Sequence, residues 1–361
     1  MKIGLIGLNQ TGKTTLFNLL TGNADDMQAK SAKGSANTGV GIVPDQRIDF
    51  LSALFKPRKT INARIELVDV AGFSVSGQDK SSGAAKFLDD VRNCEALVHV
   101  LRAFDSNSVV HDLSSVNPVR DLELVETELV FADLEFVDKR ISRIKEGKKI
   151  TKEQTDDLVL LERCFEWLED GGTMREMGLT AEERQALQHY SFLTDKPRLV
   201  VVNLDDNQWS SKEWPMKEEL QVAASSQNIP VLEICAEMEL EISQLEEEDK
   251  KLFMQDMGFE VPGVSMLAYA LYRLLGQISF FTVGEDEVRA WTIDEGTVAK
   301  HAAGKIHSDI ERGFIRAEVV KYDNLRELGS MAKVKEKGLF KLEGKEYLIS
   351  DGDIINFRFN V

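Results

Sequence analysis

Short apolar runs that end in turn-type residues recur along most of the chain. They lie at Lys2–Ile6, Ile61–Val68, Ala96–Leu101, Arg198–Val202 and Val231–Ile234. Between them, apolar residues return at helical spacing, as in Thr14–Leu20 and Lys86–Arg92. Continuous apolar strands that alternate with helices are typical of a parallel sheet covered on both faces. The pattern therefore predicts an α/β fold with a mostly parallel sheet.

The stretch from about Leu124 to Pro197 interrupts this alternation. Its apolar residues step by four and three in two seams, at Val130, Leu134, Val137, Ile141 and Ile144, and at Leu158, Leu161, Phe165 and Leu168. Such spacing predicts two antiparallel helices, an insert over residues 126–195. The predicted tip carries Lys145, Lys148, Lys149 and Lys152. This basic tip suits contact with RNA, and it equally suits a solvated turn.

After Gly276 the pattern changes to short strands and turns. The strands are expected at Ile278–Thr282, Val288–Thr292, Phe314–Val320, Glu346–Ile349 and Ile354–Phe359, around one helix near Val298–Asp309. Strands paired around a single helix form a small α+β domain. We therefore expect three parts: a sheet domain of residues 1–125 plus 196–277, the insert 126–195, and a C-terminal domain 278–361.

Composition narrows the class of protein. A chain of 361 residues that is 43% hydrophobic and 29% charged buries the core of two or three domains. Its three cysteines are odd in number and far apart, which supports neither a disulfide framework nor a zinc site. We therefore expect the protein to reside in the reducing cytoplasm. The opening residues 1–7 are too short for a secretory signal, and no run approaches the roughly 20 apolar residues of a membrane span.

The charge is distributed unevenly. The net charge of −17 argues against blanket attraction to nucleic acid. Residues 296–361, however, hold 12 Lys/Arg against 10 Asp/Glu, which gives this segment +2. A nucleic-acid face on the C-terminal part and a mixed solvated surface both fit this balance.

The strongest chemical signal is Gly7-Leu8-Asn9-Gln10-Thr11-Gly12-Lys13-Thr14, which matches G-x-x-x-x-G-K-[ST] between a strand and a helix. In this context the backbone N–H groups curl around a β-phosphate at the helix N-terminus. Lys13 reaches the β- and γ-phosphates, and the Thr14 hydroxyl ligates Mg²⁺. The predicted nucleotide contacts are Asn9, Gln10, Thr11, Gly12, Lys13, Thr14 and Thr15.

A second motif, Asp69-Val70-Ala71-Gly72, ends the next strand and has the D-x-x-G pattern of GTPase-type switches. There the carboxylate of Asp69 holds Mg²⁺ through water, and the Gly72 amide meets the γ-phosphate.

The third motif reads the base. Asn203-Leu204-Asp205-Asp206 is similar to N-K-x-D, with Leu204 in the place of lysine. A carboxylate at Asp206 accepts hydrogen bonds from guanine N1–H and its exocyclic amine, and adenine offers no such pair. Cys235-Ala236-Glu237 follows the next strand as the short element that closes the base site.

With these motifs placed, the chain resembles the YchF family of Obg-like ATPases almost end to end. The most specific stretches are Val288–Thr292, Ile306–Asp309, Gly313–Val319, Asp351–Asp353 and Phe357–Val361, with Glu126–Leu129 and Leu193–Pro197 at the ends of the insert. The resemblance implies a P-loop fold of the GTPase superfamily with an antiparallel helical insert and a C-terminal TGS domain of the β-grasp type. It further implies slow hydrolysis of ATP, often also of GTP, and association with ribosomes or other translation components.

The resemblance also bears on catalysis and on base choice. The water-orienting glutamine is hydrophobic in this family, and Phe73 stands there in this chain. The family histidine matches His111, which becomes a catalytic candidate with Lys13 and Gly72, although a lone histidine is more often a surface residue. The family usually has Glu at Asp206, so this sequence is expected to favour guanine more than its relatives do. The run Ala29–Ala36 replaces the usual switch segment, which leaves Thr38 and Ser35 as candidate switch threonine equivalents.

Three functions are open at this point. The first is a slow Mg²⁺-dependent switch that hydrolyses ATP, GTP or both. The second is a scaffold for ribosome or RNA contact that nucleotide merely stabilises. A P-loop kinase is weaker, because it leaves the base motif unexplained. For RNA, resemblance to other TGS domains indicates Lys300, Lys305, Arg312 and Arg316.

Overall fold

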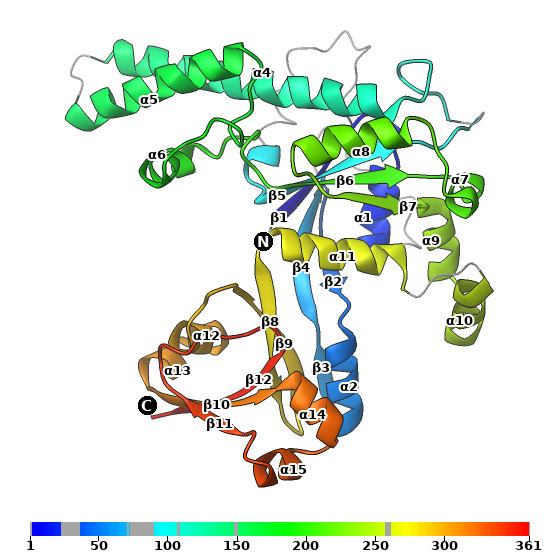
Figure 1. Cartoon of the computed structure of the whole chain (residues 1–361), viewed down its shortest axis with the longest axis vertical. Coiled ribbons are helices and arrows are strands. Elements are labelled where there is room, and N and C mark those ends of the chain that lie inside the picture. The colour runs from blue at the N-terminus through cyan, green and yellow to red at the C-terminus, as the bar shows by residue number, and fades with distance from the viewer. Residues whose placement is uncertain are drawn as a thin grey trace. The chain divides into compact units, whose positions relative to one another are not determined.

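The computed structural model describes residues 2–22, 37–70, 72, 90–106, 109–147, 151–256 and 261–360 (Figure 1). Its contacts divide the chain into two compact units. The first unit comprises Met1–Gly39 and Glu66–Val264, and the second comprises Val40–Ile65 and Ser265–Val361. Among the described residues, no helix has both the length and the apolar character needed to cross a bilayer.

The first unit is built on a six-stranded sheet of order β2-β4-β1-β5-β6-β7. Its strands are β1 (Lys2–Ile6), β2 (Asn37–Val43), β4 (Ala63–Asp69), β5 (Ala96–Arg102), β6 (Arg198–Asn203) and β7 (Val231–Ile234). The pairs β1–β4, β1–β5, β5–β6 and β6–β7 are all parallel. The predicted mostly parallel α/β sheet is therefore confirmed.

Helices lie on both faces of this sheet (Figure 1). The helices of the first unit are α1 (Lys13–Thr21), α4 (Pro118–Lys145), α5 (Lys152–Glu169), α6 (Ala181–Leu187), α7 (Asp206–Ser211), α8 (Lys217–Ser226), α9 (Ala236–Ser243) and α10 (Glu247–Asp256), with a 3₁₀ turn at Gln188–Tyr190. A buried cluster that includes Ile6, Leu97, Val125 and Leu129 joins the sheet to the first turns of α4. Such burial is the main stabilising contribution to a sheet of this kind.

Helices α4 and α5 form the predicted antiparallel hairpin (Figure 1). The residues of both predicted seams are buried or partly buried in one cluster. Thr151 starts α5 with a reciprocal capping box to Gln154. Helix α4 already begins at Pro118, and its first turns pack on the sheet, so the predicted boundary at 126 cuts through a continuous helix. Lys148 and Lys149 of the predicted tip lie outside the described residues, as does most of Lys86–Arg92.

The second unit holds a mixed sheet of order β11-β10-β12-β8-β9-β3. Its strands are β3 (Lys59–Ile61), β8 (Gln277–Val283), β9 (Glu287–Asp294), β10 (Phe314–Lys321), β11 (Lys341–Glu343) and β12 (Asp353–Phe359). Its helices are α2 (Gln46–Phe55), α11 (Gly263–Leu274), α12 (Ala299–Ile306), α13 (Ser308–Arg312), α14 (Tyr322–Leu328) and α15 (Met331–Glu336). The small α+β architecture agrees with the prediction.

One difference concerns the segment before Asp69. Strand β4 matches the apolar run predicted from Ile61, but the short strand β3 just before it was not predicted, and it pairs in parallel with β9 of the second unit. Arg47 adds an ion pair of 3.0 Å to Asp351 in the turn before β12. Residues 40–65 therefore group with the C-terminal part and not with residues 1–125 as predicted, because a pairing so distant in sequence leaves no local pattern.

Two further predictions in this unit were wrong. Glu346–Ile349 is not a strand, since only Leu348 makes an isolated bridge, to Val298. The Tyr347 hydroxyl instead donates to Asp353 Oδ2 at 2.8 Å. The single helix near Val298–Asp309 is two helices, because His307 has extended φ of −162° and its ring Nδ1 accepts from the Asp309 amide that starts α13.

Candidate nucleotide site

The turn between β1 and α1 is shaped by residues with positive φ. Gly7, Gln10 and Gly12 have φ of 141°, 59° and 96°. A side chain at Gly12 would collide with the amide of Asn203, and one at Gly7 with the carbonyl oxygen of Val100. No side chain caps α1, and its first turn has no acidic residue. The positive end of this helix and its unpaired amides are therefore available to an external anion.

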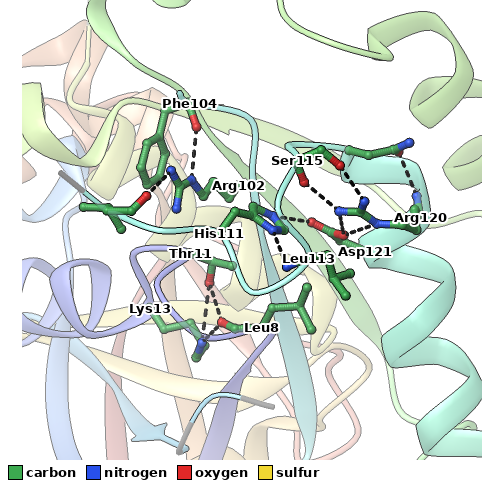
Figure 2. A network of polar contacts seen from close by, with 12 residues as sticks. Leu8, Thr11, Lys13, Arg102, Phe104, His111, Leu113, Ser115, Arg120 and Asp121 are labelled. Carbon is green, nitrogen blue, oxygen red and sulfur yellow. Dashed lines mark hydrogen bonds and ion pairs between the residues drawn. The ribbon is translucent and has the colours of Figure 1, made fainter. Parts of the chain in front are cut away.

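Lys13 is buried at the start of α1. Its ammonium donates to the carbonyl oxygen of Leu8 and, at 3.4 Å, to Thr11 Oγ1 (Figure 2). Burial lowers the pKa of Lys13 to about 8, although the charges of Asp69 and Asp112 act in the opposite direction. A phosphate bound beside Lys13 would stabilise its buried ammonium, because a nearby negative charge favours the protonated form of lysine.

Thr14, the residue after Lys13, contacts Asp69 at the end of β4. The Thr14 hydroxyl donates to Asp69 Oδ2 at 2.9 Å. Burial raises the pKa of Asp69, and the hydrogen bond from Thr14 and the charge of Lys13 lower it in part. A buried carboxylate beside a hydroxyl is an oxygen donor set that fits Mg²⁺. When bound, this ion neutralises phosphate charge.

Mg²⁺ in such a site takes its remaining ligands from phosphate and water. The described part of the chain contains no cluster of three or more His, Cys, Asp or Glu side chains able to hold a metal alone.

These groups open into one cavity of about 830 Å³, which is large enough for a nucleotide. The predicted site residues that line it are Asn9, Gln10, Gly12, Lys13, Thr14, Thr15, Asp69, Gly72, Asn203, Leu204, Ala236 and Glu237. Four predicted residues, Thr11, His111, Asp206 and Cys235, are not part of its lining.

Asn203 connects the two ends of the cavity. Its side-chain Nδ2 donates to the carbonyl oxygen of Thr11 at 3.0 Å, and its Oδ1 accepts from the Ala236 amide at 3.0 Å. The residue is only 4% exposed. The asparagine therefore fixes the phosphate loop and the base element with one side chain.

The other base-motif residues are arranged differently. Asp206 is exposed at the start of α7 and accepts a hydrogen bond of 3.2 Å from the Cys235 thiol. Burial raises the pKa of Cys235 to about 12, so the thiol keeps its proton. Leu204 also packs its side chain into a buried cluster with Leu101 and Trp214, which suits a leucine where the motif has lysine.

His111 is held by contacts within its own region. Its Nδ1 accepts from the Leu113 amide at 3.1 Å, so Nε2 carries the proton and donates to Asp121 Oδ2 at 3.0 Å (Figure 2). Both ring nitrogens are thus engaged, and the catalytic role of His111 stays a prediction. Phe73, Ala29–Ala36 and Ser35 lie outside the described residues, whereas Thr38 lies in β2.

Sequence reasoning missed the loop after β5. The cavity is also lined by Phe104, Asp105, Ser106, Val109, Asp205 and Leu240. Arg102, which is 1% exposed, organises this loop by donating to the carbonyl oxygens of Phe104 at 3.1 Å and Val109 at 2.9 Å (Figure 2). Its guanidinium also lies 4.4 Å from the centre of the Phe104 ring. An arginine that ends a fully buried strand is the signal that points to this loop.

The sheet order, the anion-ready turn and its buried lysine define a class of protein: this chain is a P-loop nucleoside triphosphatase of the GTPase type. Residues 2–132 match a family model described as 50S ribosome-binding GTPase. Residues 277–360 match the YchF-GTPase_C model, described as a protein of unknown function (DUF933).

Full-length relatives agree. The ribosome-binding ATPase YchF of Escherichia coli O157:H7 is 38% identical over 363 residues, covering 100% of this chain and 99% of the relative. The protein of the same name from Bacillus subtilis is 40% identical, with 99% of each chain covered. The solved Schizosaccharomyces pombe YchF GTPase is 26% identical, with a TM-score of 0.85 over 99% of this chain and 97% of that one. The chain belongs to the YchF family.

Proposed function

We propose that this protein is a Mg²⁺-dependent nucleotide switch that slowly hydrolyses ATP, GTP or both and acts in the cytoplasm with the ribosome or other translation components. The observation that carries the proposal is the meeting of Lys13, Thr14 and Asp69 in a single cavity at the uncapped start of α1. The names of the relatives, ribosome-binding ATPases, support the partner and the reaction.

The proposed roles follow the geometry. Lys13 holds the β- and γ-phosphates, while Thr14 and Asp69 hold Mg²⁺ directly and through water. The Gly72 amide meets the γ-phosphate. At the other end of the cavity, Asn203 holds the base site in place through its hydrogen bonds with the Thr11 carbonyl and the Ala236 amide.

Phosphate release from ATP and from GTP tests this proposal, with Mg²⁺ and with a chelator. We expect slow release that requires Mg²⁺ and that falls by roughly tenfold or more in Lys13→Ala, because a preorganised charge on the phosphates is lost. Lys139→Ala is the matched control, since this lysine on α4 is 62% exposed and pairs with Glu135 on the same helix. Absence of Mg²⁺-dependent release from the unaltered protein would contradict the proposal.

Co-sedimentation with ribosomes distinguishes the switch from the alternative, a scaffold that nucleotide merely stabilises. A switch binds ribosomes differently with a non-hydrolysable triphosphate and with diphosphate, and Lys13→Ala abolishes that difference. A scaffold that needs nucleotide only for stability keeps its partner in both states.

We further propose that the C-terminal part, a TGS domain by resemblance, contributes the RNA contact. Lys300, Lys305, Arg312 and Arg316 are all exposed in the second unit. Neutralising two or more of them should weaken ribosome binding and reduce its dependence on salt. Unchanged salt dependence after replacing all four with alanine would exclude this surface.

A further inference from the structure

Asn9 stands at a position of the phosphate loop where the motif G-x-x-x-x-G-K-[ST] allows any residue, so the motif does not account for an asparagine there. It lines the nucleotide cavity. Its side-chain Nδ2 donates to Asp112 Oδ2 at 3.1 Å. On its other side lies Gly72, where a built Cβ would be 2.8 Å from Asn9 Cα and would collide with Asn9 Oδ1. The amide is therefore confined between the glycine of the second motif and an acidic residue.

This confinement gives the amide a defined direction. A carboxylate only accepts hydrogen bonds, so the NH₂ group of Asn9 must face Asp112. The carbonyl oxygen then faces Gly72, whose amide we assign to the γ-phosphate. Asn9 thus presents its carbonyl oxygen, a hydrogen-bond acceptor, beside Gly72, where the terminal phosphate would lie.

Hydrolysis in this class of protein uses a side chain that can hydrogen-bond the attacking water. In GTPase-type switches a glutamine orients the attacking water. The residue after Gly72 in this chain is Phe73, whose side chain forms no hydrogen bond with water. His111, the other candidate, has both ring nitrogens engaged by Leu113 and Asp121.

We propose that the side-chain amide of Asn9 orients the attacking water and that Asp112 positions this amide. The inference rests on the proposed function. The carbonyl oxygen of Asn9 accepts a hydrogen bond from the water, whose oxygen forms a bond to the γ-phosphorus. The bond from that phosphorus to the β–γ bridging oxygen breaks, the bridging electrons leave with the nucleoside diphosphate, and the proton of the water passes to the phosphate released.

Steady-state hydrolysis and Mg-ADP titration of Asn9→Ala, Asp112→Asn and the double variant test this inference. We expect Asn9→Ala to lower kcat by about 10- to 100-fold, as for loss of one oriented hydrogen-bonding group. Its KM and its Mg-ADP affinity should stay within about twofold of those of the unaltered protein, because the contact concerns the reacting water and not the bound nucleotide. Its midpoint of urea unfolding should be unchanged. Asn324→Ala in α14 of the second unit is the control for removal of an asparagine.

The double variant separates direct from indirect action. If Asp112 acts through Asn9, Asp112→Asn lowers kcat by less than Asn9→Ala, and the double variant is no slower than Asn9→Ala alone. Full activity of Asn9→Ala would overturn the inference while leaving the proposed function intact. So would a parallel loss of Mg-ADP affinity and turnover, which would show that Asn9 only shapes the loop. Failure of the unaltered protein to bind or hydrolyse nucleotide would instead refute the proposed function.

Discussion

Replacing Asn203 by alanine tests the central structural claim, that one buried side chain joins the two ends of the site. The substitution removes two hydrogen bonds of 3.0 Å and leaves the Thr11 carbonyl and the Ala236 amide without this partner in a buried region. Each of these two groups costs about 1–3 kcal/mol, so we expect Asn203→Ala to lower the free energy of unfolding by about 2–6 kcal/mol. That is a large share of the roughly 5–15 kcal/mol typical of a folded domain.

Urea unfolding and Mg-ADP calorimetry measure the two consequences. Stability should fall by the amount above, and nucleotide affinity should fall with it because the phosphate loop loses its brace. Asn203→Asp is the informative companion variant: it keeps an acceptor for the Ala236 amide but sets a second acceptor against the Thr11 carbonyl, so it should be no more stable than Asn203→Ala. The reasoning is refuted if Asn203→Ala unfolds within about 0.5 kcal/mol of the unaltered protein, the range of ordinary surface substitutions.

Four more predictions concern charge, the hairpin and the base. Bound phosphate favours the ammonium of Lys13, whose pKa in the free protein is about 8. Nucleotide affinity should therefore fall as pH rises above 8, to about a tenth of its value at pH 7 by pH 9, and this fall should be absent in Lys13→Arg. Conversely, the free protein should gain stability between pH 8 and 10.5, where the unfolded state binds more protons, as urea titration at several pH values would show. Asp133→Ala should lower the free energy of unfolding by about 3–5 kcal/mol in urea, since the buried carboxylate pairs with Arg92 and accepts from the Leu193 and Thr194 amides at 3.0 and 2.8 Å. Asp206→Glu should raise the ratio of ATP to GTP affinity in calorimetry, and an unchanged ratio would remove Asp206 from base selection.

The elements that the sequence predicts well are those encoded by neighbouring residues. The five apolar runs and the two hairpin seams are local patterns, and the structure contains the corresponding strands and helices. The phosphate loop is also local, because its glycines, lysine and threonine follow one another directly. Their conformations depend on φ values that glycine adopts at little cost.

What the sequence does not reveal depends on distant contacts. The pairing of β3 with β9 joins Lys59 to Glu287, and nothing near either residue indicates it. Similarly, the apolar residues around Tyr347 have the composition of a strand, but hydrogen bonds to Asp353 hold the segment in another conformation. Arg102 donates to the carbonyl oxygens of Phe104 and Val109 beside the cavity, and the sequence around them contains no nucleotide motif.

The order of the strands explains why residues so far apart in sequence form one site. Carboxyl ends of parallel strands meet at one edge of a sheet, and ligands of open α/β folds bind there. Strand β1 leads into the phosphate loop, and its neighbours β4 and β5 lead to Asp69 and to Phe104. Farther along the same edge, β6 ends at Asn203 and β7 leads to Ala236. The strand order β4-β1-β5-β6-β7 therefore places Asp69, the phosphate loop, Phe104, Asn203 and Ala236 one after another along this edge. The topology of the sheet alone thus sets the order in which the proposed metal, phosphate and base contacts follow one another.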